Sequence, residues 1–359
     1  MSIATNNATV VRFTEALSAE LVTDPDDRAN RALEPDQVRL ETLYSGISAG
    51  TELTAYRGSN PYLTKHWNED TRLFEPASAP SFQYPIDGWG YEEVGRIVEV
   101  GSAVTKVSAG DVVYGAWGHR SHHIGTEAWA ADRVLPEGLD PIVGIFSQIG
   151  AIALNGVLDA DVHVGEDVAV FGQGVPGLLC GQLVTANGGD LIAVDAIARR
   201  LELATELGAR HALNVTDGEV AERIKQITGS GADVSIEISG FAGALQEAIR
   251  ATAYNSRVIA AGFFQGGADA LLLGEEFHHN RISVICSQIS GVSRALDHRW
   301  SELRLAQTFM RLCAEGRVKA EPLVSHRFAA EQAGEAFTLL HEQPAECVQV
   351  VLDFTGGAA

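Results

Sequence analysis

The sequence predicts an α/β protein of two domains, one rich in β-strands and one built on a parallel sheet. With 359 residues, the chain is longer than a single hydrophobic core usually supports. The first 150 residues show short segments with strand periodicity, separated by clusters of Gly, Ser and Pro. From about Asp167 onward, apolar strand segments alternate with helical segments, and this alternation is typical of βαβ units.

The β-rich part contains two clear strand predictions. Polar and apolar residues alternate along Gln37–Leu43 and Gly95–Val100, which is the pattern of strands with one buried face. The polar stretch Arg57–Tyr84 has little periodicity, so we expect a long loop there that serves as a lid or an insertion.

The second part contains four apolar runs that predict buried strands, at Asp167–Phe171, Asp190–Asp195, Ala232–Ile238 and Arg257–Ala261. Helical segments follow the first two runs, at Leu178–Ala186 and at residues 199–209. Near the end of the chain, residues 301–316 predict an amphipathic helix and residues 347–354 a final strand. Strands and helices in this order predict a parallel sheet with helical crossovers.

The composition favours a small-molecule ligand. A net charge of −21 opposes binding to nucleic acid and to anionic membrane surfaces. The four cysteines are scattered without a metal-binding or disulfide pattern, and the first residues lack the features of a secretory signal. No run of about 18 apolar residues is present, so we expect no membrane span and a cytoplasmic protein.

A glycine-rich motif follows the strand at Asp167–Phe171. It reads G-x-G-x-x-G and consists of Gly172, Gln173, Gly174, Val175, Pro176 and Gly177. Its position between an apolar strand and an apolar helix is the context in which this motif binds a dinucleotide. Gly172 allows the tight turn, Gly174 lets the backbone approach a pyrophosphate, and Gly177 lets helix and strand pack closely. The pyrophosphate then meets the N–H groups of the first helical turn, where Pro176 is tolerated.

An acidic residue ends the next strand and bears on the choice of cofactor. Asp195 lies 23 residues after Gly172, where a carboxylate accepts hydrogen bonds from the adenosine ribose and repels a 2′-phosphate. This position predicts NAD. Arg199 and Arg200 follow closely and leave NADP as the less favoured alternative.

The chain resembles the medium-chain dehydrogenase/reductase family, the alcohol-dehydrogenase-like superfamily, over nearly its whole length. The similarity is carried by GYEEVG at residues 90–95, GRIVEVGSAVTKVSAGDVV at 95–113, the glycine motif, LATELGARHALN at 203–214 and SHRF at 325–328. SGISAGTEL at 45–53 and LLLGEEFHHNRISVICSQISG at 271–291 are similar to the subgroup named for bacteriochlorophyllide dehydrogenase. That subgroup includes many dehydrogenases of unassigned substrate.

The resemblance implies a GroES-like catalytic domain formed by residues 1–155 and 301–359. It places a Rossmann domain with a doubly wound parallel sheet at residues 156–300. Relatives commonly dimerise by extending the Rossmann sheet across a two-fold axis, so a homodimer is expected. In relatives, the strand that matches Cys286–Gln288 contacts the nicotinamide amide through its backbone, which makes Ser287 a candidate cofactor residue. An ordinary buried strand is compatible with this role, because the contact uses backbone groups.

The zinc ligands of the family are missing from this sequence. The first ligand position falls at Ser48, the second at Tyr91, and the third near Ser147 or Gln148. None of these is a thiolate, imidazole or carboxylate, the ligands that zinc prefers. The four-cysteine lobe that binds structural zinc is also absent, because no cysteine precedes Cys180. We therefore expect no metal at either site.

Without zinc, side chains have to stabilise the charge that develops on the reacting oxygen. Tyr91 is the first candidate, as a donor that relays a proton if its pKa is lowered. Alternatively, Tyr91 only fills the space of the absent metal. Ser48 and Thr51 are candidates for relaying a proton through their hydroxyls, or they stabilise their loop.

Histidines and glutamates provide further candidates. His119 is a candidate base, together with His122 and His123, although we expect each of these histidines to lie at the surface. The pair His278 and His279 is likewise expected to be solvated rather than metal-binding. Glu52 and Glu92 are alternative carboxylate ligands, and we expect them to support the site from behind.

Three functions remain open. The first is a zinc-independent, NAD-dependent dehydrogenase acting on a secondary alcohol or ketone of a sugar, polyol or larger ring compound. The second is a metal-free reductase of activated double bonds, as in quinone or enone reduction, which usually uses NADPH. The third is a dinucleotide-binding sensor without turnover.

Overall fold

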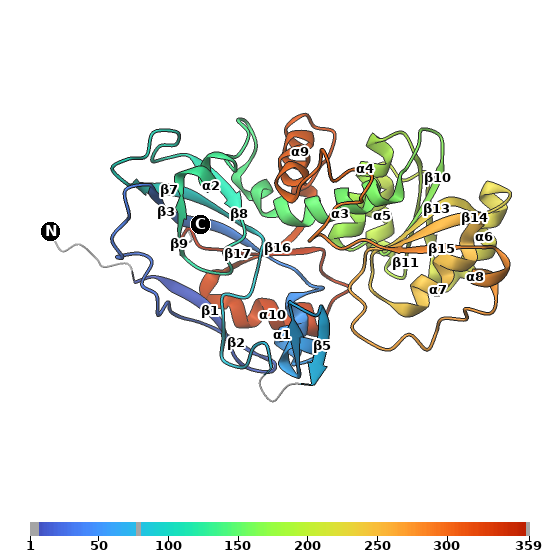
Figure 1. The fold of residues 1–359 in the computed structure, drawn as a ribbon, viewed down its shortest axis with the longest axis horizontal. Helices are drawn as coiled ribbons and strands as arrows, with labels where there is room; N and C mark the ends of the chain where they lie inside the picture. Colours follow the sequence, from blue (N-terminus) through green and yellow to red (C-terminus); the bar gives the residue numbers. More distant parts are fainter. Residues whose placement is uncertain (1–6, 77–79, 357–359) are drawn as a thin grey trace. The chain divides into compact units, whose positions relative to one another are not determined.

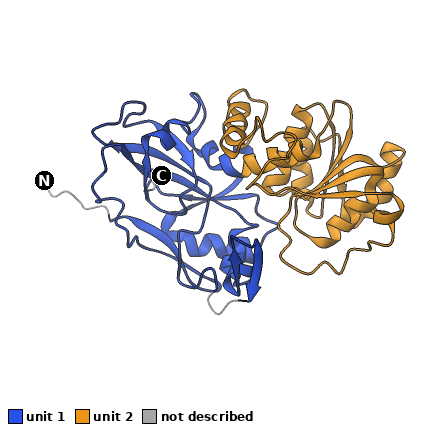
Figure 2. Ribbon diagram, in the orientation of Figure 1, with its two compact units in different colours: residues 1–148, 321–359 blue, residues 149–320 orange. Residues whose placement is uncertain are grey.

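The chain divides into two compact units, and the computed structural model describes residues 7–76 and 80–356. Unit 1 comprises Met1–Gln148 and Glu321–Ala359, and unit 2 comprises Ile149–Ala320 (Figure 2). The sequence places these boundaries at 155/156 and 300/301. The amphipathic helix expected at residues 301–316 belongs to unit 2, because Phe309 packs where a side chain on Gly150 would lie.

Unit 2 is built on a six-stranded sheet in which every adjacent pair is parallel (Figure 1). The strands are β10 (Asp167–Phe171), β11 (Asp190–Asp195), β12 (His211–Asn214), β13 (Ala232–Glu237), β14 (Thr252–Ala260) and β15 (Ser283–Cys286). Their order across the sheet is β12-β11-β10-β13-β14-β15, so the direction of winding reverses between β10 and β13. Ligands of such sheets bind at the carboxyl ends of the strands on either side of this reversal.

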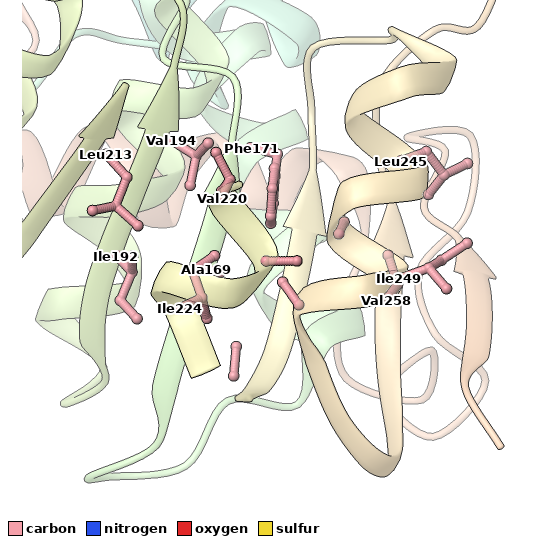
Figure 3. Close-up of a cluster of buried hydrophobic side chains, with 14 of the residues drawn as sticks. Ala169, Phe171, Ile192, Val194, Leu213, Val220, Ile224, Leu245, Ile249 and Val258 are labelled. Carbon is pink, nitrogen blue, oxygen red and sulfur yellow. The ribbon is translucent and has the colours of Figure 1, made fainter. Parts of the chain in front are cut away.

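Unit 2 also contains helices, several of which connect consecutive strands of the sheet. They are α3 (Ser147–Ala160), which begins in unit 1, α4 (Val175–Ala186), α5 (Ala198–Glu206), α6 (Val220–Thr228), α7 (Ala242–Ala251), α8 (Glu276–His279), α9 (Glu302–Ala314) and the 3-10 turn η3 (Val215–Asp217). One sheet face packs against α6 and α7 through Phe171, Val194, Ile224 and Ile249, all almost fully buried (Figure 3). α4 packs on the opposite face, where Gly181 adjoins Leu191.

Unit 1 joins the two ends of the chain in one sheet. This sheet has the order β16-β17-β3-β7-β8, and β9 also pairs with β3. Its strands are β3 (Gln37–Ile47), β7 (Glu93–Val100), β8 (Val112–Gly115), β9 (His122–Thr126), β16 (Val324–Ala329) and β17 (Gln349–Asp353). A second sheet contains β1 (Thr9–Glu15), β2 (Ser18–Thr23) and β6 (Ile86–Asp87). Pairing of Ile47 with Val350 ties the C-terminal strand to β3.

The helices of unit 1 are short. They are α1 (Glu52–Arg57), α2 (Glu127–Ala131) and α10 (Ala333–Glu342), with 3-10 turns η1 (Pro61–Leu63), η2 (Pro141–Phe146), η4 (Glu321–Leu323) and η5 (Ala330–Gln332). The core between α1, α10 and the strands includes Phe13 and Phe337, whose rings meet edge to face with centroids 4.9 Å apart. The long loop predicted at Arg57–Tyr84 is wrong in part, because the hairpin β4 (Lys65–Asn68) and β5 (Leu73–Pro76) forms within it.

One apolar segment bears on the expectation that the chain has no membrane span. Pro141–Ala160 is long and apolar enough, by length and composition, to cross a bilayer, although polar residues interrupt it. In the structure, 78% of its most apolar window is buried inside the protein. Burial of this kind identifies the segment as part of a protein core.

Candidate active site

The glycine turn of unit 2 has the geometry that its sequence predicts. Gly172 follows β10 with a φ of +97°, and a Cβ there would lie 2.7 Å from Cβ of Ser239. A Cβ on Gly177 would lie 1.8 Å from the carbonyl oxygen of Gly172. Only glycine fits at these two positions, because α4 and the loop after β13 come this close to the turn.

The helix that starts at this turn is open to a ligand. Gly174 is the N-cap of α4 and, as a glycine, supplies no side-chain cap to the helix. A Cβ on Gly174 would meet nothing closer than Cδ of Pro176, at 3.9 Å, so the space in front of it is free. Uncapped N–H groups beside an open glycine form an anion site, which fits the pyrophosphate of a dinucleotide.

The side chains of Gln173 and Asp195 brace the turn. Gln173 is fully buried, and its amide donates to the carbonyl of Val170 at 2.8 Å, so this side chain is a structural member of the motif. Asp195 ends β11, and its carboxylate accepts the N–H of Gln173 at 2.6 Å and that of Ile197 at 2.8 Å. These bonds fix the carboxylate next to the turn and leave each oxygen a second lone pair for another donor.

Glu237, which the sequence analysis did not select, supports the other side of the turn. It ends β13 fully buried, and it accepts the N–H of Ser239 at 2.8 Å and that of Gly240 at 3.2 Å. Burial raises the pKa of Glu237, and these hydrogen bonds oppose the rise. The sequence feature that could have identified Glu237 is its position as an acidic residue at the end of an apolar strand.

Two further predicted cofactor residues lie on other elements of unit 2. Arg200 is half-buried near the start of α5. Ser287 follows β15, where its N–H donates to Ala260 at 3.0 Å and its hydroxyl accepts from Asn155 at 3.3 Å. Within the segment Cys286–Gln288, Ser287 is buried whereas Cys286 and Gln288 are exposed, so only part of it fits an ordinary buried strand.

In unit 1, the structure brings together the three hydroxyl residues selected from the sequence. Ser48 follows β3, Thr51 precedes α1, and Tyr91 lies two residues before β7. The hydroxyls of Ser48 and Tyr91 are 2.5 Å apart, and Thr51 also hydrogen-bonds Tyr91. The two residues that the family resemblance aligns with zinc ligands, Ser48 and Tyr91, are therefore hydrogen-bonded to each other.

The environment of Tyr91 favours its protonated form. Burial raises the pKa of the phenol, and the nearby Glu92 raises it further. Hydrogen bonds from Ser48 and Thr51 act in the opposite direction but do not reverse the rise. A proton relay through Tyr91 was expected only if the pKa of its phenol were lowered. Because the pKa is raised instead, Tyr91 acts as a neutral phenol that donates a hydrogen bond.

A buried polar chain lies behind the hydroxyls. Nε2 of His119 is 2.7 Å from Oε2 of Glu52, and Nδ1 is 2.7 Å from Oγ of Ser45. Ser45 donates to Glu93 at 3.0 Å. Ser45 uses its single proton toward Glu93, so Nδ1 of His119 donates to Oγ of Ser45. In a neutral ring Nε2 is then an acceptor, and the protonated Glu52 donates a hydrogen bond to it.

The pKa values agree with this assignment. Burial lowers the pKa of His119 to about 4 and raises that of Glu52 well above its ordinary value. His119 has no exposed surface, and both ring nitrogens have protein partners. The expectation that His119 lies at the surface is therefore wrong, because the fold encloses the ring.

Within the described part of unit 1, two buried carboxyl oxygens have no hydrogen-bond partner: Oε1 of Glu52 and Oε2 of Glu92. Burial raises the pKa of Glu92 well above its ordinary value, and the charges of Glu52 and Glu93 add to this effect. Both side chains are close enough to Tyr91 to affect the pKa of its phenol.

The other histidines differ in exposure. His122 is buried and pairs with the hydroxyl of Ser121 at 2.8 Å. His123 is half-buried and stacks on Trp117 with ring centroids 5.2 Å apart. The burial of His122 and the partial burial of His123 contradict the expectation that these residues lie at the surface. His278 and His279 are exposed, as predicted.

Zinc does not fit the side chains at the family's ligand positions. Ser147 begins α3 next to Gln148, and neither residue offers a charged donor to complement Ser48 and Tyr91. Within residues 7–76 and 80–356, no group of three or more His, Cys, Asp or Glu side chains is arranged to hold a metal ion.

Comparison with known proteins shows where this chain belongs. A family described as zinc-binding dehydrogenase matches residues 176–307, a range that excludes all the zinc-ligand positions considered above. D-guloside 3-dehydrogenase of Escherichia coli K12 is 30% identical over 333 residues, covering 90% of this chain and 95% of that enzyme.

Solved structures confirm the α/β fold with GroES-like and Rossmann domains. A zinc-binding dehydrogenase from Sinorhizobium meliloti 1021 bound to NADP superposes with a TM-score of 0.77 at 21% identity, covering 97% of this chain and 99% of that one. An alcohol dehydrogenase from Escherichia coli CFT073 in complex with NADH has a TM-score of 0.74 at 18% identity, covering 97% and 100%. The chain thus belongs to the medium-chain dehydrogenase/reductase family of alcohol-dehydrogenase-like proteins and is an NAD(P)-dependent oxidoreductase.

Proposed function

We propose that this enzyme interconverts a secondary alcohol and a ketone on a sugar or polyol, with NAD as the hydride carrier and without a catalytic metal. The observation that carries the proposal is the 2.5 Å contact between Ser48 and Tyr91 at two positions where zinc relatives have ligands. Unit 2 supplies the dinucleotide site, and unit 1 supplies the polar groups that act on the substrate oxygen.

The chemistry follows from the state of Tyr91. In the reduction direction, the neutral phenol donates a hydrogen bond to the ketone oxygen, where negative charge develops as hydride arrives. Ser48 and Thr51 hold the phenol in place by hydrogen bonds, and the proton that completes the alcohol comes from solvent while Tyr91 keeps its own. Oxidation runs the same steps backwards. The burial of Tyr91 supports this role, because removal from solvent opposes formation of a phenolate.

NAD is favoured over NADP by Asp195. Its carboxylate stands at the end of β11 beside the glycine turn and would repel a 2′-phosphate. The solved structures include both NADP and NADH complexes, so they do not decide between the two cofactors. Arg200 on α5 is the residue that would favour NADP.

The substrate class rests on chemistry and on one relative. D-guloside 3-dehydrogenase carries a sugar in its name. A cluster of three hydroxyl groups suits an oxygen-rich substrate. The SGISAGTEL segment at residues 45–53, which holds Ser48 and Thr51, also supports membership of the bacteriochlorophyllide dehydrogenase-like subgroup.

A homodimer is the proposed assembly, formed by antiparallel pairing of β15 with its copy. A parallel sheet is normally covered on both faces and at its edges, yet Val284 is 40% exposed and Ile285 39% exposed on this edge strand. The cytoplasm is the proposed compartment, supported by four cysteines that are all free, three of them buried.

The activity test is a panel of glycosides, free sugars and polyols with NAD or NADP, followed at the NADH absorbance. We expect turnover with a glycoside or polyol and a preference for NAD. Tyr91→Phe should lower kcat about 100-fold or more, because the donor to the reacting oxygen is lost. Tyr254→Phe, an exposed tyrosine of unit 2, is the matched control and should retain full activity.

Two results would contradict the proposal. Full activity of Tyr91→Phe would remove the phenol from the reaction. Turnover restricted to enones or quinones with NADPH would instead identify a double-bond reductase.

A further inference from the structure

A pocket of about 450 Å³ lies on unit 2, at the far end of α4 from the glycine turn. Gly174 caps the first end of α4, whereas Leu183, Ala186 and Asn187 near its last turn line the pocket. A helix of this length spans about 18 Å. The pocket is therefore separate from the dinucleotide site.

The floor of this pocket is apolar. Leu154 and Val157 of α3, Leu183 of α4 and Leu312 of α9 line it and are almost completely buried. Trp300, which precedes α9, is half-buried and adds an aromatic ring to the lining. A volume of this size and an apolar floor are typical of sites for small organic ligands.

The rim is cationic. Four arginines line the pocket, Arg299, Arg304, Arg311 and Arg317, against a single carboxylate, Asp161. This excess stands out in a chain with 47 acidic and 26 basic residues. The rim thus concentrates positive charge over an apolar floor, within a protein that is strongly negative overall.

The arginines of the rim keep guanidinium N–H donors available for a ligand. Arg311 and Arg317 share one carboxylate, Glu315, at 2.8 Å and 3.9 Å. Arg304 lies over the ring of Trp300, 4.6 Å from its centroid. Arg299 is exposed, and its side chain has no hydrogen-bond or ion-pair partner among the described residues. Each guanidinium has five N–H donors, so this rim can hold a carboxylate or phosphate.

We propose that this pocket binds a small amphipathic anion, with its apolar body on the leucine floor and its carboxylate or phosphate head among the arginines. The inference is independent of the proposed dehydrogenase activity. It makes the pocket a second ligand site, through which an anionic metabolite with a hydrocarbon portion associates with the enzyme.

The test is calorimetric titration of the full chain with octanoate and with octyl phosphate. We expect one molecule bound per chain, with at least about tenfold weaker binding of 1-octanol, acetate and inorganic phosphate, because each lacks one half of the ligand. The tighter of the two octyl compounds identifies the head group. NAD affinity should be the same with and without octanoate.

Variants locate the site. The double variant Arg299→Gln, Arg311→Gln should weaken octanoate binding about tenfold or more, since each charge-assisted hydrogen bond contributes strongly. Arg294→Gln changes an exposed arginine of the same loop outside the pocket and should bind octanoate normally. Unchanged melting temperature and NAD binding show that the variants fold. Equal binding of 1-octanol, no effect of the double variant, or competition between octanoate and NAD would each overturn the proposal.

Discussion

Burial of individual titratable residues determines which side chains in the interior of unit 1 are charged. Glu52, Glu92 and Glu93 are almost completely buried together with His119, and their pKa values move toward the neutral forms. Desolvation is the largest cause for each of them. The result is a nearly uncharged interior behind Tyr91, which keeps that phenol protonated.

Glu92 provides a pH-dependent prediction. Its folded pKa is raised, so its contribution to stability is present below its ordinary pKa and is lost as pH rises toward the folded pKa. Glu92→Gln lacks this ionisation. The free energy of unfolding of Glu92→Gln should therefore improve relative to wild type as pH increases from 5 to 9, by up to about 1.4 kcal/mol per pH unit.

Urea unfolding at several pH values measures this difference. Glu34→Gln alters an exposed glutamate and should follow the wild-type pH dependence. Parallel curves for wild type and Glu92→Gln would show that Glu92 ionises freely in the folded protein.

The residues of this interior could be selected from the sequence only in part. Tyr91, Ser48 and Thr51 were found because a family pattern aligns them, and the fold does bring them into contact. The burial of His119 depends on a partner 67 residues away in the chain, Glu52. No local pattern reports such a contact, and a His-rich segment with polar neighbours resembles a surface loop.

At the scale of elements, two glycines of the turn are expected to have different roles: Gly177 in folding and Gly174 in binding NAD. Gly177→Ala places a Cβ 1.8 Å from the carbonyl oxygen of Gly172 and should destabilise the protein by about 3 kcal/mol or more. Gly174→Ala enters open space with an extended backbone, so stability should change by less than about 0.5 kcal/mol. Its methyl group instead occupies the approach of the pyrophosphate, and the Kd for NAD should rise about tenfold.

Thermal unfolding together with NAD titration separates the two variants. The account is contradicted if Gly174→Ala binds NAD as well as wild type, or if Gly177→Ala is fully stable.

Strands and helices were predictable where burial was periodic. β10, β11 and β13 are apolar runs in the sequence, and their observed bounds agree with the predicted ones within one residue. The hairpin β4–β5 was missed and β15 was expected only from the family resemblance, because most of their residues are exposed. Exposed strands lack the alternation of polar and apolar residues that identifies a half-buried strand.

At the scale of the whole molecule, the uncovered edge of unit 2 predicts the assembly. Ile285→Lys on β15 places a charge in the proposed dimer contact and should convert the dimer to a monomer, measured by analytical ultracentrifugation. Ile227→Lys on α6 changes an isoleucine of similar exposure and should remain dimeric. A wild-type protein that sediments as a monomer would contradict this assembly.

The central claim concerns how the enzyme manages charge on the reacting oxygen. The most direct measurement is the rate of NAD reduction by one preparation before chelation, after exhaustive chelation, and after zinc is restored, with zinc content determined at each stage. The account predicts equal rates at all three stages and zinc far below one ion per chain. A rate that disappears with the metal and returns with it would show that a bound cation, rather than Tyr91, stabilises that charge.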